Sequence, residues 1–285
     1  MKSFFKHFKL VSLSVLLVFN LLIFYSVFAN QNGVLKIVFL DVGQGDSILI
    51  QSPLGNQMLI DGGPNKKVLE SLGEIIPFYD RFIDAVIATH PDADHIAGLP
   101  EVLKNYKISN YFDSGDEGET KIAKELQFGI KENNVHYEKI KTGSLVDLGG
   151  GAYLRILSPV GDLQSKDTNT DSIVAKLYFG DTSVLLTGDA PEEIEDDLAK
   201  KYGAELKSQI LKVAHHGSKN SLSDSFISAV QPDYSVISVG EDNRYGHPHK
   251  EVLDFLGIIE TKILKTFETG NIVFESDGYN LKEVK

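Results

Sequence analysis

Two histidines and two aspartates lie within one short segment of this sequence. The segment follows an apolar run at residues 85–88 and contains His90, Asp92, Asp94 and His95. Imidazole and carboxylate groups are common ligands of zinc, manganese and iron, so a loop that holds four of them can direct several to one point. An aspartate here could instead cap the following helix. Four such residues so close together after an apolar run favour a metal site.

Two later segments also place ligand-type residues after apolar runs. Residues 183–186 are followed by a Gly-Asp pair that ends at Asp189, and residues 210–214 are followed by His215 and His216. Taken alone, Gly-Asp after a strand is usually a turn. Taken with the first segment, these residues bring further ligand types from other strand ends. The repetition predicts that the loops gather at one edge of the sheets.

Apolar runs alternate with helical patterns through residues 33–285, and no linker rich in Pro, Gly or Ser divides them. The apolar runs predict strands at residues 35–40, 47–50, 58–60, 85–89, 108–112, 154–157, 173–179, 183–186, 210–214, 235–239, 262–265 and 272–274. The periodic segments predict helices at residues 67–75, 100–104, 120–132, 191–201, 224–229 and 250–256. So many strands predict one α/β domain in which two sheets pack face to face with helices outside.

The N-terminal segment differs in character from the rest of the chain. Three lysines precede a mostly apolar run at residues 10–28, and no acidic residue occurs before Asp41. A charged start, an apolar run and small residues before a polar stretch are typical of a secretory signal peptide. The run is also long enough to remain as one membrane anchor. We expect a leader at residues 1–29, cleaved after Ala29 or retained as an anchor, and a chain that lies outside the cell or on the outer face of the cytoplasmic membrane.

The composition limits how a site can be built. The chain has no cysteine, which excludes a disulfide scaffold, a Cys-ligated zinc site and a thiol nucleophile. It carries 28 Lys+Arg against 40 Asp+Glu, for a net charge of −12. This balance argues against a broad basic surface for nucleic acid. A phosphate-bearing substrate therefore needs a local positive centre, which bound metal ions would supply.

The ligand-type segments resemble the metallo-β-lactamase fold. They read His90-x-Asp92-x-Asp94-His95, with Gly-Asp and His-His later in the chain, whereas the usual first motif is His-x-His-x-Asp-His. Residues 40–47, 59–64, 211–218 and 243–248 are also similar to the extracellular hydrolase domain of ComEC-type competence proteins and to secreted relatives that lack the channel. Phosphorylcholine esterases share a similar first motif. The resemblance implies a four-layer αβ/βα sandwich with two mixed sheets.

The resemblance also implies two divalent metal ions and a ligand set for them. The implied ligands are His90 and Asp92 for one ion, Asp94, His95 and His215 for the other, and Asp189 as a bridge between the two. The family usually adds a histidine before the strand at residues 173–179, but this chain has Asn169-Thr170-Asp171-Ser172 there. The ion at His90 would then have more oxygen ligands. Zinc is the expected metal, with manganese as the alternative.

Further roles follow from the same resemblance. Asp94 is expected to orient the attacking water and accept its proton, and His247 to donate a proton or to contact the oxyanion. Asp61 would support the metal loop through hydrogen bonds. From the residue types alone, the segment at residues 243–250 is expected to form a small positive rim together with Lys212, His216 and Lys219. The residues expected to support the ligands or to contact substrate are Asp61, His216, Ser218, Asn243 and Arg244.

These expectations define an exported hydrolase that uses two metal ions to activate water, acting on phosphodiester bonds in DNA or a related substrate. A phosphorylcholine-like group or another small or cell-wall phosphodiester is the alternative substrate. A non-catalytic binding protein on the same fold is the alternative of another class. β-Lactam hydrolysis is disfavoured because the motifs resemble the competence branch. No obligate protein partner is expected, and the cytoplasmic membrane is a partner only if the leader is retained.

Overall fold

The computed structural model describes His7, Lys9 and residues 11–21, 33–116, 118–161 and 167–284. Residues 11–21 are helical, and their apolar side chains are exposed. Most of the expected leader and its cleavage point after Ala29 lie outside the described residues. Within the described ranges, no helix combines the length and the apolar character needed to cross a membrane.

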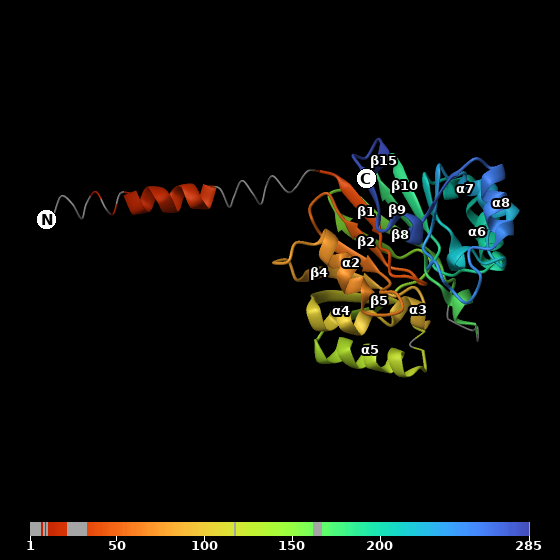
Figure 1. Ribbon diagram of the computed structural model, residues 1–285, viewed down its shortest axis with the longest axis horizontal. Coiled ribbons are helices and arrows are strands. Elements are labelled where there is room, and N and C mark those ends of the chain that lie inside the picture. Colours follow the sequence, from red (N-terminus) through yellow and green to blue (C-terminus); the bar gives the residue numbers. More distant parts are fainter. Residues whose placement is uncertain are drawn as a thin grey trace.

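Two mixed sheets form the centre of the molecule (Figure 1). The first sheet has the order β15 (Leu281–Val284), β14 (Ile272–Ser276), β1 (Leu35–Phe39), β2 (Ile48–Gln51), β3 (Gln57–Ile60), β4 (Phe82–Ile87), β5 (Lys107–Asp113), β6 (His136–Lys139). The second has the order β13 (Lys262–Lys265), β12 (Tyr234–Ile237), β11 (Ile210–Lys212), β10 (Thr182–Leu186), β9 (Val174–Phe179), β8 (Ala152–Ser158), β7 (Leu145–Gly149).

Helices cover the outer face of each sheet (Figure 1). Those on the first sheet are α2 (Lys67–Ile75), α3 (Ala93–Ile96), α4 (Leu99–Asn105) and α5 (Lys121–Glu132). Those on the second are α6 (Glu192–Tyr202), α7 (Asp224–Val230) and α8 (Lys250–Ile258). The remaining described helical segments are the short α9 (Thr266–Thr269) and the 3-10 turns η1 (Thr168–Asp171), η2 (Gly203–Leu206) and η3 (Ala214–Gly217). The expected four-layer α/β sandwich is confirmed.

Alternation along the strands explains the layers. In β1, Leu35, Ile37 and Phe39 pack in the apolar cluster between the sheets, whereas Val38 packs in the cluster under α2, α4 and α5. Successive side chains of a strand point to opposite faces, so a strand buried on both faces needs a continuous apolar run. This is why the central strands could be read from apolar runs in the sequence.

Three strands were not predicted, namely β6, β7 and β15, and each lies at the edge of a sheet. Their residues are mostly exposed or half-buried, as in β6, whose sequence is HYEK. An edge strand pairs on one side only and keeps polar side chains in contact with water. Such strands therefore lack the apolar run by which the central strands were recognised.

The candidate site lies where parallel strands of both sheets end. Strands β3, β4 and β5 run parallel in the first sheet, and β10, β11 and β12 run parallel in the second. The carboxyl ends of parallel strands lie at the same edge of a sheet, which is the usual position of ligand sites in α/β proteins. The loops after β3, β4, β10 and β11 carry Asp61, His90, Asp189 and His215 respectively.

Candidate metal centre

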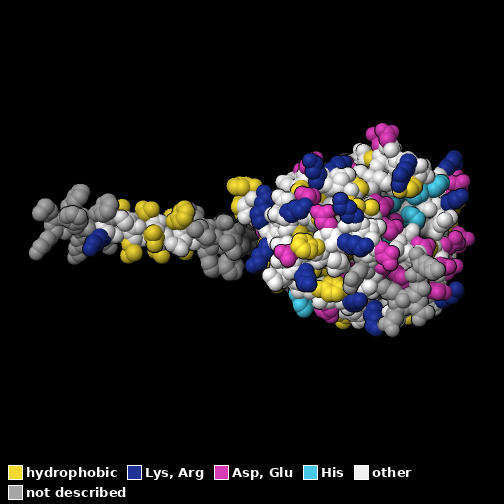
Figure 2. Space-filling model, turned by 90° about the horizontal axis from the view of Figure 1, so that it is seen from below, with side chains coloured by type: hydrophobic (Ala, Val, Ile, Leu, Met, Phe, Trp, Pro, Cys, Tyr) yellow, Lys and Arg dark blue, Asp and Glu magenta, His cyan; other side chains and the backbone are white. Residues whose placement is uncertain are grey.

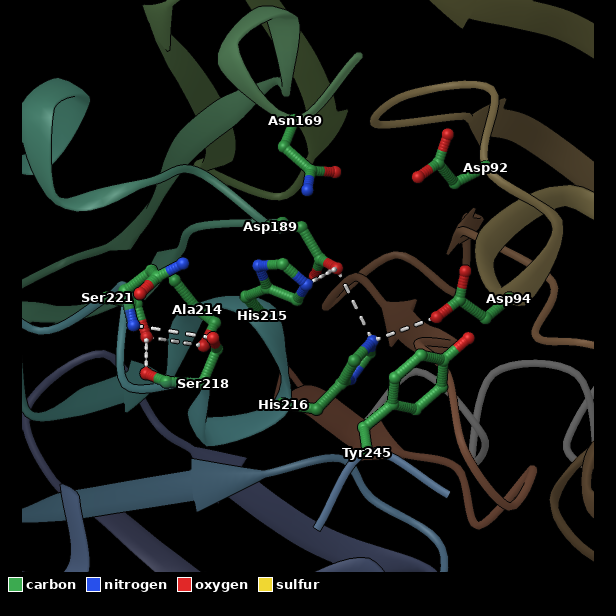
Figure 3. Close-up of polar contacts among 12 residues, drawn as sticks. Asp92, Asp94, Asn169, Asp189, Ala214, His215, His216, Ser218, Ser221 and Tyr245 are labelled. Carbon is green, nitrogen blue, oxygen red and sulfur yellow. Dashed lines mark hydrogen bonds and ion pairs between the residues drawn. The ribbon is translucent and has the colours of Figure 1, made fainter. Parts of the chain in front are cut away.

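Four ligand-type side chains from both sheets meet at this edge. Asp94, His95, Asp189 and His216 each offer one ligand atom, and the four atoms lie within 4.8 Å of one another. His216 Nε2 is 3.4 Å from Asp94 Oδ2 and 3.5 Å from Asp189 Oδ2 (Figure 3). His95 Nε2 is 3.3 Å from Asp189 Oδ2. Imidazole and carboxylate at these separations match what a divalent transition metal requires of its ligands.

His216 holds the place in this cluster that was predicted for its neighbour His215. His216 is fully buried, whereas the side chain of His215 is 30% exposed and its Nε2 lies 3.9 Å from Asp189 Oδ2. The structure therefore favours His216 as the ligand and places His215 at the open side of the centre. Two adjacent histidines have the same residue type and nearly the same spacing, so the sequence could not separate them.

The turn that carries both histidines has an unusual backbone. His215, His216 and Gly217 have φ angles of 49°, 54° and 80°, so three successive residues adopt the left-handed region. Residues other than glycine occupy this region at a cost of about 1–2 kcal/mol each. A Cβ on Gly217 would lie 2.6 Å from Pro248 Cβ, so only glycine fits at this point. The strained turn directs both imidazoles toward Asp189.

The three buried imidazoles share one orientation, with Nδ1 held by a neighbour and Nε2 left free. Their Nδ1 partners are the Asp61 carboxylate for His95 at 2.8 Å, the Ser238 carbonyl for His216 at 2.8 Å and the Thr89 hydroxyl for His90 at 3.0 Å. Nε2 of all three is buried and has no hydrogen-bond partner among the described residues. Buried nitrogens without a hydrogen bond are rare in folded proteins, and bound metal ions would satisfy all three. The residues present therefore fit a metal centre.

Asp61 connects two loops of the centre. It accepts hydrogen bonds from the Thr89 backbone N–H at 2.8 Å and from the Thr89 hydroxyl at 2.8 Å, in addition to its bond with His95. Asp61 itself adopts φ 60°. These contacts place Asp61 where the resemblance implies a supporting carboxylate, while its effect on metal binding stays a prediction.

Lys212 lies beneath the cluster, fully buried. Its ammonium forms an ion pair with Asp46, donates to the Gly188 carbonyl at 2.8 Å and lies 3.6 Å from Asp189 Oδ1. The prediction that Lys212 and His216 belong to a positive rim of the site was wrong, because both are buried beneath it. Neither the burial of Lys212 nor its pairing with Asp46 was recognised, although a lone lysine inside an apolar strand is a signal of a buried ion pair.

Carboxylates outnumber permanent cations at the centre, and this changes the imidazole pKa values. Burial lowers the pKa of His216, but Asp189 and Asp46 outweigh this effect and raise it to about 9. Burial, reinforced by the charge of His95, lowers the pKa of His90 to about 3. A metal that binds to His216 displaces the proton that this raised pKa retains, so its affinity increases with pH.

The loop before α8 forms a wall beside the cluster. The rings of Tyr245 and His247 stack with centroids 5.6 Å apart, and His247 lies 5.6 Å from the ring of His215. Arg244 Nη2 donates to the Tyr245 hydroxyl at 2.7 Å. Figure 3 shows the Tyr245 hydroxyl pointing in the direction of Asp94. Tyr245 was not among the predicted site residues, although it belongs to the predicted segment 243–248.

His247 is a neutral imidazole in this setting. Burial lowers its pKa to about 4, and His215 and His216 act in the same direction. Nδ1 of His247 is buried and has no hydrogen-bond partner among the described residues. These properties suit a neutral hydrogen-bonding group and do not favour the imidazolium that a proton donor requires at neutral pH.

Two other predicted residues shape loops. The Asn243 side chain accepts from the His247 backbone N–H at 2.9 Å and donates to the Gly240 carbonyl at 2.9 Å, which closes the loop before α8. Ser218 is buried, and Figure 3 shows it on the side of the histidine turn away from Asp94. Both therefore support the loops, and their side chains are already engaged there.

The fold and the site together define a class of protein, and the sequence comparison names it. The family model of the metallo-beta-lactamase superfamily matches residues 40–241, a range that includes every residue of the cluster. The chain therefore belongs to the metallo-beta-lactamase superfamily.

Curated relatives include Competence protein ComA of Neisseria gonorrhoeae, which is 29% identical over 240 residues, or 82% of this chain and 31% of that protein. ComE operon protein 3 of Bacillus subtilis is 34% identical over 258 residues, which are 84% of this chain and 33% of that protein. Recombination protein 2 of Haemophilus influenzae is 30% identical over 263 residues, which are 90% of this chain and 30% of that protein. The chain thus spans about a third of the length of these relatives. The predicted resemblance to competence proteins is confirmed.

Solved structures agree on the fold. The metallo-beta-lactamase fold protein YhfI from Bacillus subtilis has a TM-score of 0.59 at 14% identity and covers 85% of this chain and 100% of its own. CmlA from Streptomyces venezuelae, a diiron β-hydroxylase, has a TM-score of 0.54 at 14% identity and covers 88% of this chain and 54% of its own. At these identities the likeness supports the fold alone.

Proposed function

We propose that this chain is a metal-dependent hydrolase of phosphodiester bonds. The observation that carries the proposal is a set of three buried imidazole Nε2 atoms without a hydrogen-bond partner among the described residues, in His90, His95 and His216. Those of His95 and His216 face the Asp189 carboxylate, that of His216 also faces Asp94, and that of His90 lies 3.7 Å from Asp92 Oδ2. Bound divalent ions supply a water of lowered pKa and neutralise charge on a phosphate. This is the local positive centre that a chain of net charge −12 needs for such a substrate.

The ligand set of the proposal follows the geometry. Asp94, His95, Asp189 and His216 would hold one ion, and His90 with Asp92 would begin the set for the other. Asp189 belongs to the first group and would bridge the two ions, as the resemblance implies. Asp61 and the Ser238 carbonyl hold the rings of His95 and His216 so that Nε2 faces the centre.

The remaining residues of the site would act on the water and the substrate. The half-buried carboxylate of Asp94 can accept the proton of the attacking water and orient it. Arg244, Tyr245 and His247 offer N–H and O–H donors on one wall, and the planar fork of Arg244 suits phosphate oxygens. In this role His247 donates a hydrogen bond as a neutral imidazole.

The proposed substrate is a nucleic-acid phosphodiester. The names of the relatives refer to competence and recombination, which supports DNA or a related molecule. The excess of acidic residues opposes a long binding track, so we infer that the site takes one strand or an end. A small phosphodiester such as a phosphorylcholine ester is the second candidate, favoured by the same acidity.

We also propose that the chain acts outside the cytoplasm. The lysine-rich start, the apolar run at residues 10–28 and the absence of cysteine support this location. A fusion of the chain to a reporter that is active only after export would show activity, and the loss of residues 1–29 would abolish it. A reporter that stays inactive behind the intact chain would contradict the proposal.

The central test combines metal analysis with an activity assay. The purified full chain should contain one to two equivalents of zinc or manganese and hydrolyse bis(p-nitrophenyl) phosphate. Because each removes a ligand atom, His95→Ala and Asp189→Ala should lower the rate by roughly 100-fold or more. His136→Ala, on the exposed edge strand β6, is the matched control and should leave the rate unchanged.

The same assay separates the alternatives. Single-stranded DNA, a phosphorylcholine ester and a β-lactam are compared as substrates of the same preparation. Full activity in His95→Ala and Asp189→Ala would show that catalysis does not occur at this centre. A protein loaded with metal but inert on every substrate would instead favour the non-catalytic binding protein.

A further inference from the structure

Asn169 approaches the side of the centre that contains His90 and Asp92. It lies in η1, the 3-10 turn that leads into β9. Figure 3 shows Asn169 beside Asp189, with its amide oxygen on the side that faces Asp92. The Thr168 hydroxyl donates to Asp92 Oδ1 at 2.7 Å, which ties η1 to the loop of the first motif. Asp92 therefore both holds the η1 turn through Thr168 and lies on the side that the Asn169 amide oxygen faces.

The amide oxygen of Asn169 lacks a partner. Oδ1 is buried and accepts no hydrogen bond from any described residue. His90 Nε2 is likewise buried and has no hydrogen-bond partner among the described residues. His90 Nε2 lies 3.7 Å from Asp92 Oδ2. A buried acceptor without a donor destabilises a fold, and a cation bound between Asn169 and Asp92 would satisfy both acceptors.

The fold does not need the Asn169 side chain to form the turn. The Asn169 backbone N–H donates to Asp167 Oδ1 at 3.1 Å, and its carbonyl accepts from the Ser172 N–H at 3.1 Å. The turn joins the first motif through the Ile173 N–H, which donates to the Thr89 carbonyl at 2.9 Å. Since backbone groups and Asp167 hold η1, the orientation of the Asn169 amide calls for an explanation other than turn formation.

The donor sets of the two positions differ in chemistry. The group around His95 and His216 has two imidazole nitrogens. The other side has the His90 imidazole and the Asp92 carboxylate, and the Asn169 amide oxygen lies on the side that faces Asp92 (Figure 3). Imidazole suits zinc, while carboxylate and amide oxygens suit manganese. We propose that Asn169 is an oxygen ligand of the ion at His90 and gives this position a preference for manganese over zinc. The inference rests on the metal centre of the proposed function.

The test measures metal binding without substrate. The metal-free full chain is titrated with Mn²⁺ and with Zn²⁺ by calorimetry, and electron paramagnetic resonance reports whether two Mn²⁺ ions are close enough to couple. Wild type should bind two Mn²⁺ ions with a coupled signal. Asn169→Ala should lose the coupled signal and weaken the second Mn²⁺ by roughly 10–100-fold, the range for loss of a partner at a metal site.

Two further variants guard against a simple folding defect. Asn169→Asp keeps an oxygen at the same place and should restore the coupled signal. Asn169→His should keep two ions but exchange the preference, with tighter Zn²⁺ and weaker Mn²⁺ at the second position. Asn133→Ala, at the exposed end of α5, is the control and should match wild type.

Two results would overturn the inference. One is an Asn169→Ala protein with wild-type affinity for both Mn²⁺ ions, and the other is a wild type that binds a single ion. Both are read without substrate, so they are distinct from failure of the proposed function. Inactivity on all phosphodiesters with Asn169-dependent binding of two ions would refute the proposed reaction and leave the ligand assignment standing.

Discussion

At the residue scale, the direction of each imidazole decides what the centre can bind. His216 and His215 have backbone φ angles within a few degrees of each other, and both rings lie beside Asp189. The His216 ring is fully buried, whereas the His215 side chain is 30% exposed. The Ser238 carbonyl holds His216 Nδ1 at 2.8 Å, which leaves Nε2 for a ligand. A neighbouring residue thus selects the nitrogen that can bind a metal.

Replacing the two histidines separately tests this assignment. His216→Ala should lower metal affinity by more than the roughly 10–100-fold that loss of an outer hydrogen-bond partner gives, because a ligand atom itself is removed. His215→Ala should keep the metal content of wild type and act as the matched control. Isothermal titration of the metal-free proteins provides the comparison, and the reverse order of effects would restore His215 as the ligand.

Lys212 supplies one positive charge next to the carboxylates of the centre, where a metal ion would add more. Its ammonium contacts Asp46 and the Gly188 carbonyl and lies near Asp189, so a permanent cation lies beneath the carboxylates. Burial lowers the pKa of Lys212, but Asp46 and Asp189 outweigh this and raise it. The lysine therefore remains charged and reduces repulsion among the carboxylates before any metal binds.

At the element scale, helix α6 stabilises the loop that follows the histidine turn. Glu195 of α6 is buried, and its Oε2 accepts from the Leu222 N–H at 2.6 Å and the Ser223 N–H at 2.9 Å. Ser223 caps α7 by accepting from the Phe226 N–H. Burial raises the pKa of Glu195 to about 8, although the two N–H groups oppose the shift. The connection between α6 and α7 therefore depends on pH.

Glu195→Gln should change how stability varies with pH. With a pKa raised from 4.5 to about 8, the folded state keeps a proton that the unfolded state has already lost. The free energy of unfolding therefore falls as pH rises from 4.5 to about 8. The stability that protonated Glu195 contributes is fully present only below pH 4.5. Glutamine does not titrate, so Glu195→Gln removes this dependence of the unfolding free energy on pH. Urea denaturation at pH 5 and pH 8.5 should show a smaller loss for Glu195→Gln than for wild type, and equal losses would contradict the assignment.

At the scale of the whole molecule, the acidic excess limits how a polyanion can approach. On the face shown in Figure 2, basic and acidic side chains are interspersed over the described residues, and histidines lie beside acidic groups. The net charge is −12. Beyond about 10 Å such charges are screened at 0.1 M salt, so local donors at the site outweigh the overall charge at short range.

This charge distribution predicts a shallow salt dependence for DNA. A protein that neutralises Z phosphates of a single strand loses affinity with a slope of about −0.7Z against the logarithm of salt concentration. With Arg244 and few other cations near the site, we expect a slope shallower than about −2. The KM for a single-stranded oligonucleotide between 50 and 200 mM salt measures it. A slope of about −4 or steeper would indicate an extended basic track that the composition argues against.

The sequence predicted the architecture where burial leaves a local signal. Strands such as β1 and β10 are buried on both faces and read as apolar runs, and the number of such runs indicated two packed sheets. The edge strands β6, β7 and β15 were missed because they keep polar side chains toward water. The motif of His90, with Asp189 and the later histidine pair, was recognised for the same local reason, since each follows a strand end.

By itself, then, the sequence determined the fold class and the residue types at the centre, because these depend on local patterns and spacing, and the resemblance of its motifs indicated the superfamily. Only the tertiary structure decided that His216 faces Asp94 while His215 does not, and that Lys212 is buried against Asp46. It also brought Tyr245 and Asn169 to the same edge (Figure 3). These placements arise from contacts between segments far apart in the chain, because a strained turn and the packing of two sheets set the direction of each side chain. The type of a residue does not determine that direction.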